Sequence, residues 1–134
     1  MIGREEIEKI FRRLFKSGDK LRRLPKSRAE TQAFLALAAS ELDPQDVYSE
    51  PELNGLLEDW LADFASLSHL DYVTVRRSLV DHGFVLRDQR GESYRSNQVV
   101  INSAIKLEAR SVQPKLLFDE AKLVRRTRRR QKVT

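Results

Sequence analysis

Apolar residues recur every three or four positions in several stretches of the chain, which is the spacing of one face of an α-helix. The first such stretch, from Ile7 to Phe15, stops just before Gly18, and glycine readily adopts the left-handed conformation that ends helices. Three more helices are predicted to follow Ser27, Ser49 and Asp71, residue types that cap helix starts, over residues 28–42, 50–64 and 72–82.

A β-hairpin is expected after the last of these helices. The short segments 84–88 and 92–96 flank a turn that contains Gly91, and Val47-Tyr48 is long enough only for a strand fragment. Three helices, a strand fragment after the first of them and a closing hairpin form the element order of a winged helix-turn-helix. We therefore predict a mainly α fold with a small β-hairpin, in which a winged helix-turn-helix core is flanked by amphipathic N- and C-terminal helices.

The 134 residues are expected to form a single domain, because chains of this size commonly fold around one core. Its predicted parts are a basic amphipathic helix with its connector over residues 1–23, the winged-helix core over 24–96, and C-terminal helices with a basic tail over 97–134. No apolar run approaches the roughly 18 residues of a membrane span, and the acid-containing start does not resemble a secretory signal. We expect a cytoplasmic protein without membrane contact.

Charge is distributed unevenly along the chain, which has a formal net charge of +5. Residues 1–28 carry ten basic and four acidic side chains, whereas residues 29–71 carry ten acids and no Lys or Arg. Residues 122–134 carry seven basic side chains and no acid, and we expect them to be flexible. Such cationic ends indicate a polyanionic partner, and they would form one surface if both ends of the chain lie together.

Few residues are suited to catalysis or to metal binding. The chain has no cysteine, and its two histidines, His69 and His82, are 13 positions apart, without the spacing of a metal site or a catalytic triad. His82, next to Gly83, is interpreted as a cation at the C-terminus of a helix. We therefore expect no enzymatic activity, no catalytic residue, no cofactor and no metal.

Part of the chain resembles a prokaryotic family, the domain of unknown function numbered 2087. The resemblance covers about residues 24–95, and its matching segments are Leu24-Pro25-Lys26, Tyr48 to Asn54, Asp71 to Phe84, Arg87-Asp88, Gly91 and Tyr94-Arg95. It implies a winged-helix-like fold and a link to transcription. The family supplies no established activity and no catalytic residues.

Candidate nucleic-acid contacts follow from the predicted fold. On the third core helix, Arg77, Thr74 and Ser78 face outward with Arg76 at the boundary, so they are placed to contact a major groove. The other candidates are arginines of the hairpin and of the tail: Arg87, Arg90, Arg95, Arg125, Arg126, Arg128, Arg129 and Arg130. The alternative is that Arg76 and Arg77 only solvate an exposed face and pair with Asp71 or Asp81.

We predict a nucleic-acid-binding regulatory protein, with DNA favoured over RNA. The acidic block over residues 29–71 weighs against this prediction, because carboxylates near phosphates reduce affinity. One alternative is a protein-interaction module that docks a partner through this acidic face, or pairs two chains through the terminal helices. Association with RNA or with ribosomes is another alternative, because a short basic tail suits either polyanion.

Overall fold

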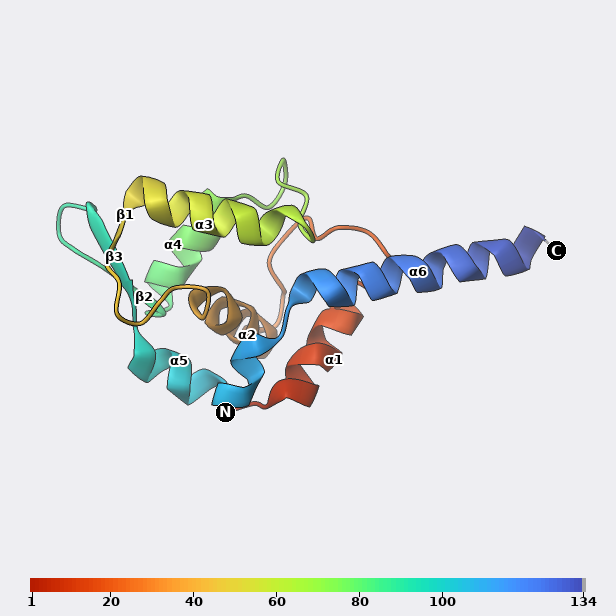
Figure 1. Ribbon diagram of the computed structural model, residues 1–134, viewed down its shortest axis with the longest axis horizontal. Coiled ribbons are helices and arrows are strands. Elements are labelled where there is room, and N and C mark those ends of the chain that lie inside the picture. Colours follow the sequence, from red (N-terminus) through yellow and green to blue (C-terminus); the bar gives the residue numbers. More distant parts are fainter. Residues whose placement is uncertain (134) are drawn as a thin grey trace.

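The computed structural model describes residues 1–133 and the side chains of residues 1–131. Its helices are α1 (Arg4–Leu14), α2 (Arg28–Ala39), α3 (Glu50–Ala62), α4 (Tyr72–Asp81), α5 (Gln98–Ala104), the short 3-10 helix η1 (Leu107–Ser111) and α6 (Pro114–Val133). Its strands are β1 (Tyr48–Ser49), β2 (Val85–Arg87) and β3 (Ser93–Ser96). The fold is mainly α with a small antiparallel sheet, as predicted (Figure 1).

The predicted helix starts are confirmed by their caps. Ser49 accepts a hydrogen bond from the backbone N–H of Glu52, whose carboxylate accepts one from the N–H of Ser49. At the start of α2, Ser27 accepts a hydrogen bond from the backbone N–H of Glu30, and its hydroxyl donates to the Glu30 carboxylate. Asp71 accepts from the backbone N–H of Thr74 at the start of α4. The predicted helices overrun the observed ends by one to three residues, because the apolar pattern continues into turns where side chains such as Leu42 stay buried.

The sheet contains the predicted hairpin and one further strand. β3 lies in the centre and pairs with β2 on one side and with β1 on the other, in the order β1-β3-β2. Gly91 has a φ of +71° in the hairpin turn, a conformation that residues with a side chain rarely adopt. The strand fragment at Tyr48 therefore docks onto the hairpin, opposite Tyr94, and connects the sheet to the start of α3.

A cluster of aromatic rings joins the terminal helices to the rest of the core. Phe11 of α1 contacts Phe34 of α2 and Phe64, which follows α3. Phe15, just after α1, contacts Phe64 as well, and the ring centroids of these pairs lie 5.9 to 6.4 Å apart. Phe118 of α6 lies 5.3 Å from Phe15. Helices α1 and α6 pack against each other, so the two basic ends of the chain lie together (Figure 1).

Helix α6 extends past the end of α1 and projects from the body (Figure 1). Its first turns bury Leu117 and Phe118, whereas Leu123 and Val124 are exposed. We call residues 126–131 the α6 arm. The tail that the sequence predicted to be flexible is helical over its described backbone, because the arginine-rich stretch lacks proline and glycine. Thr134 and the side chains of residues 132 and 133 lie outside the described part.

Candidate nucleic-acid interface

The outward face of α4 carries three of the predicted contact residues. Val75 and Leu79 are fully buried in the core, which turns Thr74 and Arg77 to the solvent and leaves Ser78 half-buried. Among the residues that the structure describes, no carboxylate lies within ion-pair distance of Arg77. The guanidinium of Arg77 is therefore available to an external acceptor.

Arg76 has a different environment: the sequence placed it at the boundary of the outward face as a candidate contact, whereas the structure turns it inward. Its side chain is only 15% exposed, and its Nη1 lies 3.1 Å from Oε1 of Glu50. The same nitrogen donates a hydrogen bond of 2.5 Å to Oδ1 of Asn54. Neighbouring helical positions differ in direction by about 100°, so Arg76 turns toward the first turns of α3 while Arg77 does not. Arg76 therefore fixes α3 relative to α4.

The arginines of the hairpin are exposed on the strands and the turn. Arg87, Arg90 and Arg95 take part in no ion pair among the described residues. A Cβ on Gly91 would lie 2.7 Å from Nη2 of Arg87, so this guanidinium packs over the turn. The carboxylate of Asp88 accepts from the backbone N–H of Glu92, which lowers the pKa of Asp88 and keeps one negative charge on the hairpin.

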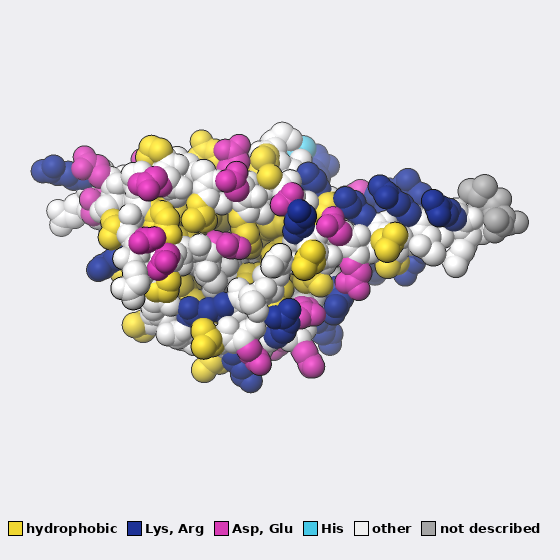
Figure 2. Space-filling model, viewed as in Figure 1, with side chains coloured by type: hydrophobic (Ala, Val, Ile, Leu, Met, Phe, Trp, Pro, Cys, Tyr) yellow, Lys and Arg dark blue, Asp and Glu magenta, His cyan; other side chains and the backbone are white. Residues whose placement is uncertain are grey.

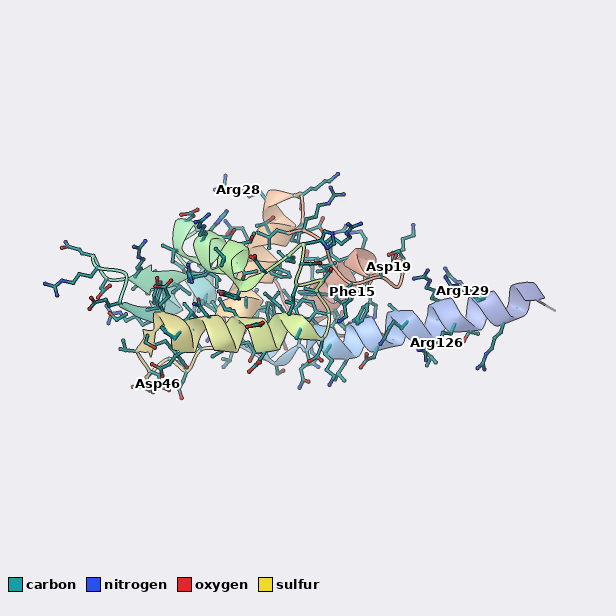
Figure 3. All side chains as sticks on the ribbon, turned by 90° about the horizontal axis from the view of Figure 1, so that it is seen from above. Phe15, Asp19, Arg28, Asp46, Arg126 and Arg129 are labelled. Carbon is teal, nitrogen blue, oxygen red and sulfur yellow. The ribbon has the colours of Figure 1, made fainter. Side chains whose placement is uncertain are left out.

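The arginines of α6 fall into two groups. Arg125 is half-buried, and its Nη1 lies 2.5 Å from Oδ1 of Asp19. The four arginines of the α6 arm are exposed and form no ion pair within the described residues: Arg126, Arg128, Arg129 and Arg130. Figure 3 shows Arg126 and Arg129 on the part of α6 that projects from the body.

The basic connector before α2 is held against the turn between α3 and α4. The N–H of Leu21 donates to the carbonyl of Phe64, and the N–H of Ser66 donates to the carbonyl of Leu21. Nη2 of Arg22 lies 2.6 Å from Nε2 of His69. The sequence identified these N-terminal cations without placing them, because the pairing joins segments more than 40 residues apart. The connector thus places cations at the turn that precedes the predicted recognition helix.

Acidic side chains are most dense over one part of the face drawn in Figure 2. Asp and Glu side chains gather over α3 and the segment before it, while Lys and Arg side chains follow α6 (Figure 2). Seen from above, α3 lies on the same side as Asp46, and α4 lies on the side of Arg28 (Figure 3). Asp46 and α3 therefore lie on the side of the body opposite to Arg28 and α4, whereas Asp71 of the same acidic block caps α4 itself.

The two histidines have local roles within the fold. Nδ1 of His82 lies 2.9 Å from the carbonyl of Ser78 at the end of α4, where the sequence placed it.

No group of three metal-binding side chains gathers anywhere in the described part of the chain. None of its described helices combines the length and the apolar character needed to cross a membrane.

Comparison with known proteins identifies a family. No curated protein and no solved structure matches the chain. A family model described as "Uncharacterized protein conserved in bacteria (DUF2087)" matches residues 20–96, from the connector to the end of β3. This is more than half of the chain, and it contains the resemblance found over residues 24–95. The chain therefore belongs to the DUF2087 family.

Proposed function

We propose that the protein binds duplex DNA as a winged helix-turn-helix regulatory protein. The order α2, β1, α3, α4, β2, β3 with a β1-β3-β2 sheet supports this proposal, because α4 then takes the place of the recognition helix and the β2-β3 hairpin that of the wing. The observation that carries the proposal is the exposed Arg77 on α4, which has no carboxylate partner among the described residues.

In the proposed complex, one side chain contacts a base and the other contacts are made to phosphates. Arginine matches guanine because its planar fork donates to two acceptors in the major groove, so Arg77 reads a base. The hydroxyl of Ser78 donates to a phosphate oxygen, and the hairpin and arm arginines add charge along the backbone, whereas the hydroxyl of Thr74 already donates to Asp71 and offers no free donor. DNA is favoured over RNA, because the major groove of B-DNA admits a helix whereas that of A-form RNA is too narrow.

Replacing Arg77 by alanine is expected to weaken binding to a preferred duplex by about tenfold to a hundredfold, the value of one good bidentate base contact. The preference for guanine at one position should decrease as well, because the side chain that contacts this base is removed. The duplex is selected from a random pool with the unmodified protein, and dissociation constants are measured by fluorescence anisotropy. The melting temperature should change little, since Arg77 is exposed.

Two further variants distinguish base reading from general effects. Lys115→Ala removes an exposed cation at the start of α6 and should leave the preference unchanged. Arg76→Ala leaves Asn54 and Glu50 without their partner and should lower the free energy of unfolding by about 1 to 3 kcal/mol. Equal affinity and equal base preference in Arg77→Ala and the unmodified protein would contradict the proposed role of α4.

A further inference from the structure

A groove of about 560 Å³ lies between α1 and α6, and none of its lining residues belongs to α4. Its floor is apolar and is formed by Phe15, Leu117, Ala121 and Val124. The side chain of Val124 is 46% exposed, so part of this floor is open to solvent. An apolar floor between two helices is a common place for a small-molecule site.

The rim of the groove is strongly cationic. It carries Arg12, Lys16, Arg125, Arg128 and Arg129, and its single carboxylate, Glu120, lies 3.5 Å from Nε of Arg12. Lys16, Arg128 and Arg129 have no carboxylate partner among the described residues. An occupant with a negative charge would therefore meet unpaired cations at the edge of an apolar surface.

The end of the groove is held in place by close packing. Arg125 pairs with Asp19, and its side chain packs on Gly18, where a Cβ would lie only 2.7 Å from Cδ of Arg125. Gly18 has a φ of +79°, so its conformation and the space above it both favour glycine. These contacts fix the distance between α1 and α6, so the groove is formed before an occupant binds.

We propose that this groove binds a small organic anion with an apolar body, such as an acyl or aryl carboxylate. The apolar body would cover Ala121 and Val124, and the anionic head would meet Arg128 and Arg129 at the rim. The groove volume of about 560 Å³ falls within the range of about 300 to 1,000 Å³ that is usual for small-molecule sites, which favours a small occupant.

Occupation of the groove would also regulate binding of DNA, a consequence that rests on the proposed function. Arg128 and Arg129 belong to the α6 arm, which the proposed function assigns to phosphates. An anion held by these two side chains competes with the phosphates for the same charges. The bound anion is therefore expected to lower the affinity of the protein for duplex DNA.

The site is tested with anilinonaphthalene sulfonate, a fluorescent aryl sulfonate, and with decanoate as a competitor on the full chain. Saturable binding at one site that decanoate displaces is expected. Arg128→Gln should weaken the probe about tenfold through the loss of a charge-assisted contact. Arg126→Gln removes the same charge outside the groove and should leave probe binding unchanged. Ala121→Phe should block the probe by filling the floor, with circular dichroism confirming the fold.

The outcomes separate the site from the proposed function. Equal losses in Arg128→Gln and Arg126→Gln would overturn the site, as would undiminished binding in Ala121→Phe. Stronger displacement by an acidic helical peptide than by decanoate would overturn the small-anion assignment. In a second assay, decanoate should weaken duplex binding of the unmodified protein but not of Ala121→Phe. If duplex binding occurs and decanoate leaves it unchanged, competition is refuted; if no duplex binding occurs, only the proposed function fails.

Discussion

Replacing three arginines of the α6 arm by glutamine is expected to weaken binding to random-sequence duplex DNA about a hundredfold at 100 mM salt. The variant combines Arg126→Gln, Arg129→Gln and Arg130→Gln. At about 100° per residue these three positions fall on one side of the helix, so they can follow one phosphate strand. Each phosphate contact contributes about 0.9 to the slope of log affinity against log salt, so the slope should fall by between two and three.

A matched variant controls for the loss of net charge. Lys9, Lys106 and Lys115 are exposed, form no ion pair among the described residues and lie outside the proposed interface. Their triple replacement by glutamine removes the same charge and should change the affinity by less than about fivefold, because long-range effects of exposed charges are screened. Dissociation constants for both variants are measured by anisotropy over a salt series. Equal losses in the two variants would refute a specific role for the arm.

Phe64→Ala is expected to lower the free energy of unfolding by about 3 to 5 kcal/mol, the usual cost of removing a buried phenyl ring. Phe64 is 1% exposed and lies at the centre of the aromatic cluster. Its ring centroid is 4.9 Å from Trp60, 6.0 Å from Phe15 and 6.3 Å from Phe34. Because a domain is stabilised by only about 5 to 15 kcal/mol, this one change should remove a large part of the stability.

Urea denaturation followed by circular dichroism measures this effect. Leu123 is 64% exposed, so Leu123→Ala should lower the free energy of unfolding only slightly. It serves as the control for the removal of an exposed apolar side chain. A loss below about 1 kcal/mol in Phe64→Ala would show that the cluster is not the centre of the core.

The cluster also joins Phe15 and Phe118, which lie outside residues 20–96, to the family segment. The terminal helices are therefore expected to unfold together with that segment.

Local signals in the sequence predicted most of the fold. Ser27, Ser49 and Asp71 act over three residues, and the caps that they form depend little on the rest of the chain. Gly91 marked the hairpin turn in the same way, because its positive φ is a property of one residue. Helix ends were less predictable, since a buried apolar residue such as Leu42 looks the same in a turn as in a helix.

The candidate site was predictable only where side-chain direction follows from helical spacing. That spacing placed Arg77 outward, but the partner of Arg76 is Asn54, 22 positions away, and no local pattern reveals it. Pairing of Leu21 with Ala65 brings the basic connector to the turn before α4, and it too depends on long-range packing. The groove between α1 and α6 requires both ends of the chain, so neither end alone indicates it.

Binding of the full unmodified chain to a random duplex over a salt series tests the central claim most directly. The account predicts clear binding at about 50 mM salt and a steep, linear fall of log affinity with log salt up to about 200 mM. A protein that shows no binding at the lowest salt, or an affinity that does not change across the series, would contradict it.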